Sequence, residues 1–320
     1  MSLRTPATEE PRRFALRLFA GMTISALTCL STPARATEGA GGLYLLGSQA
    51  LGAGLTPAPG WYVSSAVAQY SGAVGSASVG GVTLVTLKKR VDSIAVNLLY
   101  APTTPILGGQ AAISVTAPYA YLRLSGEVIA RRDITGSVSN TGLGDTAVNG
   151  RLGWKINSSF SHAVSLTVWA PTGGYSKGFN ASIGHDRWAC DVLWAMTYIA
   201  PQSHLELSAA LGYGINGPND ITHYRSGNEA HLELAMGKRL SPHWVVGVAG
   251  YAYRQVTADT GRGANLGSLK GRVLGAGPAV NYGTRWGSHA LAIGFRYYKE
   301  FDAKDHFHGD VVIASATYRL

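Results

Sequence analysis

The sequence has no apolar run long enough to form a membrane-spanning helix. Such a helix needs about 20 consecutive, mostly apolar residues. The longest uncharged stretch, residues 39–87, is interrupted by many glycines and by Pro57 and Pro59. Because glycine and proline break helices, this composition excludes a chain that crosses a membrane with helices.

A shorter apolar run near the N-terminus has the features of a secretory signal. Residues 18–30 carry no charge, follow three arginines between positions 12 and 17, and precede the Ala-Arg-Ala sequence at 34–36. A basic start, an apolar centre and a small-x-small cleavage site are the parts of a signal peptide. We therefore expect residues 1–36 to direct export and to be removed.

Cysteine is scarce. The expected signal contains Cys29, and Cys190 is the only cysteine of the remaining chain, so an intramolecular disulfide is excluded. Cys29 raises the alternative of a lipid-modified N-terminus. The residues before it, Ala-Leu-Thr at 26–28, fit a lipid-attachment motif poorly, and cleavage after Ala36 is the preferred interpretation.

Charged residues make up only 14% of the chain, although the formal net charge is +9. The basic residues are scattered, with neither a basic helix nor a cluster of basic and aromatic residues of the nucleic-acid-binding type. A nucleic-acid partner is therefore not expected. Basic loops beside an anionic lipid surface agree better with this charge.

The clearest pattern present is the alternation of apolar and polar residues over 229–236. It has the two-residue period of a β-strand with one apolar and one polar face. The SPHW sequence at 241–244 then turns the chain, and residues 244–253 form the expected return strand. The polar face of the first strand holds Glu229, His231 and Glu233, and the apolar face holds Ala230, Leu232, Leu234 and Met236.

Alternation and turn residues predict about twelve such strands over most of the chain. Their expected ranges are 60–71, 91–101, 109–124, 143–155, 160–171, 188–199, 204–215, 228–240, 243–256, 271–282, 289–301 and 309–320.

The connections between these strands alternate in length. Those near Thr103, Ser158, Gln202, Pro242 and Arg285 are short, and those near Gly80, Thr135, Lys177, Asn219, Gly263 and His306 are longer. A soluble sandwich would show the same alternation of faces, but short turns on one side and long loops on the other are typical of an outer-membrane barrel. The sequence thus predicts an all-β, antiparallel, up-and-down transmembrane β-barrel over residues 60–320, with its apolar faces toward lipid.

The segment between the signal and the first strand, residues 37–59, is irregular and rich in glycine. Two interpretations agree with it: a loose leader, or a plug that folds into the lumen of the barrel. The second would shield the apolar cluster at 43–46 from water.

Several longer motifs occur together in the chain. They are EGAGGLYLLGSQALGAGLTPAPGWY at 38–62, GLGDTAVNGRLGW at 142–154, VWAPTGGY at 168–175, YRSGNEAHLELAMGKRLSP at 224–242 and GRVLGAGPAVNYG at 271–283. In this order they resemble the outer-membrane family described as "protein involved in the meta-pathway of phenol degradation", which includes SphA-like proteins. The resemblance implies a barrel that acts as an uptake channel or porin-like transporter for aromatic or other hydrophobic compounds, and it supplies no catalytic residues.

Polar residues on the expected inner face are the candidate site. Two functions remain open for them: they set the selectivity of a hydrated pore, or they form ion pairs that close the lumen and only stabilise the barrel. The candidates are Asp145, Asn149, Arg151, Asp191, Glu206, Glu229, His231, Glu233 and Arg296.

No catalytic residue, cofactor site or metal site is predicted. His306 and His308, with Asp305 and Asp310, have the residue types of a metal cluster, but a solvated loop is the preferred interpretation. No nucleophile elbow or triad spacing appears.

The sequence therefore predicts passive diffusion of small hydrophobic or aromatic compounds through a barrel in the outer membrane of a Gram-negative cell. The expected partners are outer-membrane lipids and lipopolysaccharide, a small hydrophobic or aromatic ligand and the barrel-insertion machinery. The alternatives are a structural or adhesive barrel and a lipid-modifying enzyme.

Overall fold

The computed structural model describes residues 42–79, 82–130, 132–178, 181–261 and 270–320. The expected signal peptide and residues 37–41 lie outside the described part of the chain. Within the described part, no helix has the length and apolarity needed to cross a membrane.

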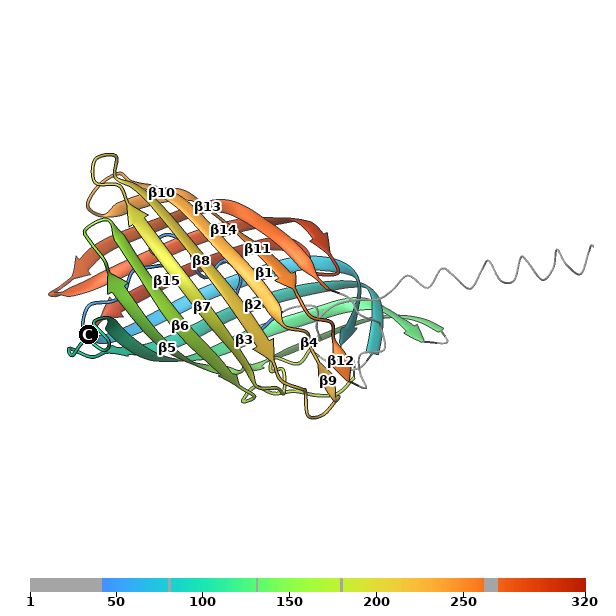
Figure 1. The fold of residues 1–320 in the computed structure, drawn as a ribbon. Helices are drawn as coiled ribbons and strands as arrows, with labels where there is room; N and C mark the ends of the chain where they lie inside the picture. Colours follow the sequence, from blue (N-terminus) through green and yellow to red (C-terminus); the bar gives the residue numbers. More distant parts are fainter. Residues whose placement is uncertain (1–41, 80–81, 131, 179–180, 262–269) are drawn as a thin grey trace, which may run out of the picture. The chain divides into compact units, whose positions relative to one another are not determined.

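The described chain consists of β-strands joined by turns and loops (Figure 1). The strands are β1 (Gly60–Val79), β2 (Val82–Ala101), β3 (Gln110–Ala130), β4 (Arg132–Leu143), β5 (Thr146–Lys155), β6 (Phe160–Ala170), β7 (Ala189–Ile199), β8 (Leu205–Asn216), β9 (Tyr224–Arg225), β10 (Glu229–Arg239), β11 (Trp244–Gln255), β12 (Thr260–Gly261), β13 (Arg272–Trp286), β14 (His289–Lys304) and β15 (His308–Arg319).

Antiparallel pairing between sequence neighbours closes these strands into a barrel. β1 pairs with β2 on one side and with β15 on the other, so the first and last strands meet. β4 and β5 pair with successive parts of β3 and act as one strand interrupted at Gly144 and Asp145. β9 and β12 form a separate two-stranded sheet. The predicted transmembrane barrel of twelve strands is confirmed.

Three connections differ from the prediction. The long loops expected near Gly80 and Thr135 are largely strand, because β1 and β2, and β3 and β4, continue their pairing almost to the ends of the two hairpins. The connection at His306 is short, since β14 ends at Lys304 and β15 begins at His308. Backbone hydrogen bonds can extend a hairpin whatever its side chains are. The apolar alternation is weak in these extensions, so the sequence pattern did not predict them.

Long connections nevertheless gather at one end of the barrel. Residues 171–188, 217–228 and 256–271 all join strands at the same end as the β1–β2 and β3–β4 hairpins. We call this the loop end and the opposite one the turn end. Outer-membrane barrels place their long loops outside the cell, so the loop end corresponds to the external side.

The two faces of the wall have the reverse polarity of a soluble protein. On β10, the Glu233 side chain is 1% exposed, whereas its neighbour Leu234 is 53% exposed. The same contrast recurs around the barrel, where exposed aliphatic residues alternate with buried polar ones. Large apolar side chains are stable on an outer surface only when lipid surrounds it.

The N-terminal segment, residues 42–59, lies against the inner wall before it enters β1. Its backbone and side chains contact inward-facing residues of β5, β7, β8, β10 and β14. The segment therefore occupies the lumen, and its contacts define the candidate site.

Candidate functional site

The structure places the nine predicted residues on the inner side of the wall or beside it. Six are buried and three are partly exposed. The buried ones are Asp145, Asp191, Glu206, Glu229, His231 and Glu233, and the others are Asn149, Arg151 and Arg296.

Glu233 binds the N-terminal segment at two points. Its carboxylate accepts hydrogen bonds from the Tyr44 hydroxyl (2.6 Å) and the Gln49 backbone amide (2.8 Å). On β14, the Arg296 guanidinium donates to the Ser48 carbonyl (3.0 Å). Buried backbone groups need partners, and an irregular segment cannot supply them itself. Side chains of the wall supply them here.

Toward the turn end, the side chains of Glu206 and Arg151 also bond to backbone groups of the N-terminal segment. The Gly52 amide donates to the Glu206 carboxylate (2.5 Å), and the Arg151 guanidinium donates to the carbonyls of Ala53 (2.5 Å) and Leu55 (3.2 Å). An anionic side chain thus meets a backbone donor, and a cationic one meets backbone acceptors. Both charges serve to hold the segment in the lumen.

Between these anchors the segment touches the wall directly. The Gly54 amide donates to the Thr197 hydroxyl (2.9 Å) on β7. A Cβ atom added at Gly54 would lie 2.4 Å from the carbonyl carbon of Met196. The backbone of the segment lies directly against the backbone of β7 at this position, which leaves no space for a side chain, so only glycine fits. Thr197 was not among the predicted site residues because a lone threonine in a strand carries no distinctive signal.

Asp191 and His231 form a buried pair beneath the aromatic ring of the segment. The Nε2 atom of His231 lies 2.9 Å from the Asp191 carboxylate, and both side chains are 2% exposed. The Tyr44 ring stacks on the His231 ring with centroids 3.8 Å apart. This pair therefore supports the segment as well as joining β7 to β10.

Glu229 lies at the loop end of the lumen beside a buried arginine. Asn216 donates to the Glu229 carboxylate (3.2 Å) and to the Gly227 carbonyl (2.9 Å). Arg187 is only 1% exposed, and its charge acts on both Glu229 and Asp259. Sequence reasoning missed Arg187 because it lies in a loop, where no periodicity shows which side chains turn inward.

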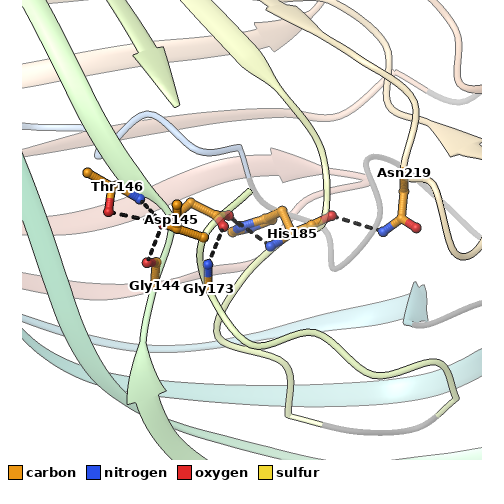
Figure 2. A network of polar contacts seen from close by, with 7 residues as sticks. Gly144, Asp145, Thr146, Gly173, His185 and Asn219 are labelled. Carbon is orange, nitrogen blue, oxygen red and sulfur yellow. Dashed lines mark hydrogen bonds and ion pairs between the residues drawn. The ribbon is translucent and has the colours of Figure 1, made fainter. Parts of the chain in front are cut away.

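Asp145 has a role other than lining a pore: it fastens the 171–188 loop to the interruption between β4 and β5 (Figure 2). Its carboxylate accepts hydrogen bonds from the backbone amides of Gly173 (3.0 Å) and His185 (2.8 Å), and it lies 3.0 Å from the His185 Nδ1 atom. His185 in turn accepts a hydrogen bond at its carbonyl from Asn219 (2.9 Å). Residues of two external loops are thereby linked to the wall.

A cavity of about 240 Å³ remains between the segment and the wall. Its surroundings are aliphatic and aromatic, with two charged groups. The Lys89 ammonium lies 5.4 Å from the centre of the Phe307 ring. Residues that line it include Leu43, Leu46, Tyr70, Ser93, Tyr251 and Phe307.

Glu300 is the carboxylate of this cavity and is already well bonded. It accepts hydrogen bonds from the hydroxyls of Tyr70 (3.0 Å) and Tyr251 (2.8 Å) and from the Gly309 amide (2.9 Å). The alternation that includes Arg296 extends along β14 to Glu300, so this residue was within reach of sequence reasoning. Its three donors fix the shape of the cavity on that side.

The short β14–β15 connection closes the cavity and is sensitive to acid. Burial lowers the pKa of His306 from its ordinary 6.5 to about 4, and the nearby positive charges of Lys89 and His308 act in the same direction. The neutral ring is favoured in the folded state, so stability is present at neutral pH and is lost as pH falls below 6.5. At pH 5 the loss is about 2 kcal/mol.

We therefore expect faster hydrogen exchange over residues 304–308 at pH 5 than at pH 7, after correction for intrinsic rates. The variant His306→Gln cannot titrate and should show the same exchange at both values. An equal pH response in this variant would assign the effect to another group.

Four histidine rings of the described chain bond to carboxylate or carbonyl oxygens. Such contacts are made by His185, His231, His243 and His306. Among the residues that the structure describes, no group of three or more His, Cys, Asp or Glu is arranged to hold a metal ion.

Comparison with known proteins identifies the family to which this barrel belongs. The family model described as "Putative MetA-pathway of phenol degradation" matches residues 75–315, most of the chain. The chain belongs to this family. The resemblance seen in its motifs is thereby confirmed. No curated protein matches the sequence.

Two solved structures are similar to this family member at low sequence identity. The COG4313 outer membrane channel from Pseudomonas putida F1 is 13% identical, with a TM-score of 0.63, over 86% of this chain and 98% of that chain. The β-domain of the Bordetella autotransporter BrkA is 12% identical, with a TM-score of 0.46, over 82% of this chain and 100% of that chain. The first of these likenesses establishes the outer-membrane barrel fold.

Proposed function

We propose that this barrel lies in the outer membrane and lets small hydrophobic or aromatic compounds diffuse passively through its lumen. The observation that supports this most directly is the cavity beside the N-terminal segment. A pocket lined by apolar and aromatic side chains with few polar groups is the usual form of a small-ligand site. Family membership agrees with this function, and the similar Pseudomonas putida protein is an outer membrane channel.

The size and chemistry of the cavity define its ligand class. A volume of about 240 Å³ exceeds what a single benzene ring needs. Leu43, Leu46 and Val311 supply apolar contacts, while Tyr70 and Phe307 supply aromatic ones. A compound with one substituted ring or a short alkyl chain fits this description. The N-terminal segment lies beside the cavity and bonds to five strands of the inner wall, so passage of a ligand along the lumen requires this segment to shift.

Filling the cavity should reduce transport. Ser93 lines it from β2, and its neighbour Ile94 faces lipid and is 44% exposed. We expect Ser93→Trp to lower the uptake of phenol and toluene into vesicles by about tenfold. The added ring occupies the space of the ligand, and overpacking of about 1–3 kcal/mol weakens ligand binding in the cavity by about that factor or more. Ile94→Trp adds the same ring to the opposite face of the strand and should leave uptake unchanged.

Equal uptake by the Ser93→Trp variant and the unsubstituted barrel would show that this cavity is not on the route. Absence of any phenol or toluene uptake by the unsubstituted barrel would contradict the channel function itself. A barrel whose segment only seals and stabilises the lumen is the second candidate, and the dense hydrogen bonding of the segment favours it. Removal of the segment separates the two.

A further inference from the structure

Along the barrel axis, the outward-facing side chains change from apolar to charged toward the loop end. On β2, the outward residues Ile94, Val96 and Leu98 are exposed and apolar. Toward the loop end, the next residues of the same face are Asp92 and Arg90. Since β2 runs from the loop end to the turn end, the charges lie on the external side of the apolar band.

The strand register carries this boundary across the neighbouring strands. Asp92 lies opposite Tyr121 of β3 and Gln69 of β1. Gln69 lies opposite Val312 of β15, and Val312 lies opposite Tyr297 of β14. Five strands therefore share one row, and four of them carry an aromatic or polar residue in it, with Val312 as the exception. Such a row marks the interface between hydrocarbon and lipid headgroups.

Basic residues form the next outward row. Arg90 lies directly opposite Arg123, and on its other side opposite Ser71. Ser71 pairs with Asp310, which pairs with Lys299. Lys88 follows one step closer to the loop end on β2. We call Lys88, Arg90, Arg123 and Lys299 the basic patch.

The carboxylates nearby neutralise only part of this charge. Arg90 bonds to Asp92 (2.9 Å), and Lys299 bonds to Asp310 (2.8 Å). Lys88 and Arg123 have no carboxylate partner among the described residues, and the Arg123 Nε atom donates to the Ser137 hydroxyl instead (3.2 Å). Within the described part of the chain, the charges of Lys88 and Arg123 therefore remain without a neutralising carboxylate.

The pairing of Arg90 with Arg123 is unfavourable by itself. Side chains directly opposite on neighbouring antiparallel strands lie about 5 Å apart at Cβ, and like charges there destabilise a sheet. An anion between the two guanidinium groups removes the repulsion. A groove of about 420 Å³ lies among the patch residues on the wall, which leaves room for such an anion.

We propose that the basic patch binds the phosphate groups of lipopolysaccharide in the outer leaflet. The patch lies just beyond the apolar band at the external end, where the phosphates of this lipid are found beside the acyl chains. Guanidinium groups bind phosphate oxygens through paired, charge-assisted hydrogen bonds. The acyl chains would lie along the apolar face formed by Val67, Ile94 and Val115.

This inference is independent of the proposed transport, since the patch faces away from the lumen. The test uses the full barrel, purified in detergent and stripped of lipid. Lipopolysaccharide is added, and bound lipid is counted by native mass spectrometry together with the shift in thermal unfolding. We expect the triple variant Lys88→Gln, Arg90→Gln, Arg123→Gln to bind at least about tenfold more weakly, because three phosphate contacts are lost.

A matched control removes positive charge from the turn end, where no such lipid lies. Lys238→Gln with Arg285→Gln should bind like the unsubstituted barrel. Arg90→Lys with Arg123→Lys keeps the charge and should retain most of the binding. Both controls also show that substitution on the outer wall permits folding.

Two further ligands identify what the patch recognises. Dephosphorylated lipopolysaccharide should bind as weakly to the unsubstituted barrel as the intact lipid does to the triple variant. Inorganic phosphate alone should give a much smaller thermal shift than lipopolysaccharide, because it lacks the acyl chains that contact the apolar face. Unchanged binding by the triple variant, or equal stabilisation by inorganic phosphate, would overturn the proposal.

Discussion

A variant that lacks residues 42–56 should conduct ions about tenfold better than the intact chain, or more. The bore of a twelve-strand barrel lies between those of filled eight-strand barrels and open porins, so the lumen is wide enough to conduct once the segment is gone. Deletion removes the groups bound by Glu233, Glu206 and Arg151 and leaves these side chains to water. Single-channel recording in planar bilayers measures the change.

A single substitution at Gly54 should also raise ion conductance. At Gly54 any side chain meets the backbone of Met196, so Gly54→Val should displace the segment locally and raise the open fraction. Gly150→Val is the matched control, because a Cβ atom added at Gly150 has no heavy atom within 4 Å. A deletion variant that folds but conducts no better would support the sealed, structural barrel.

The open variant also tests the predicted selectivity residues. Once the segment is absent, Glu229 and Glu233 line free lumen, and the double variant Glu229→Gln, Glu233→Gln should shift the reversal potential toward anions. An unchanged reversal potential would show that these two carboxylates do not set the ion selectivity of the lumen.

Asp191→Ala should lower the free energy of unfolding by about 1–3 kcal/mol. Removal of one partner from a buried hydrogen-bonded pair leaves the other polar group unsatisfied in a medium of low polarity. His231 would be left in this state, because its Nε2 atom bonds to Asp191 at 2.9 Å and both side chains are 2% exposed. Urea unfolding in lipid vesicles, followed by tryptophan fluorescence, gives the value.

The chain offers an exposed pair of similar geometry as the control. Arg272 and Asp302 lie 3.0 Å apart, with 52% and 54% of their side chains exposed. Asp302→Ala should change the unfolding free energy by no more than about 1 kcal/mol. In addition, Asp191→Ala combined with His231→Leu should recover part of the lost stability. Similar losses for Asp191→Ala and Asp302→Ala would contradict the importance of burial.

The faces of the strands could be predicted from the sequence. Side chains point alternately to the two sides of a pleated strand, so the positions of Glu233 and Leu234 follow from local order alone. The expected export signal and the expected alternation of loop lengths then predicted which face meets lipid. For the same reason the inner location of Arg151, Asp191 and Arg296 needed no tertiary information.

Local order does not reveal where pairing stops or what a side chain bonds to. β1 continues to Val79 because β2 pairs with it, although the apolar alternation fades well before that residue. Asp145 has the alternation of a pore residue, yet its partners are loop residues at 173 and 185. Such contacts depend on how the loops fold back, which no periodicity encodes.

The strand number, the antiparallel order and the two faces of the wall were thus determined by the sequence itself, because period and turn chemistry are local properties of the chain. Only the tertiary structure decided that residues 42–59 lie in the lumen against the inner wall and that Arg187 is buried beside Glu229. The bond between Tyr44 and Glu233 joins residues 189 positions apart. An irregular segment has no period of its own, so its place is set by the wall that surrounds it.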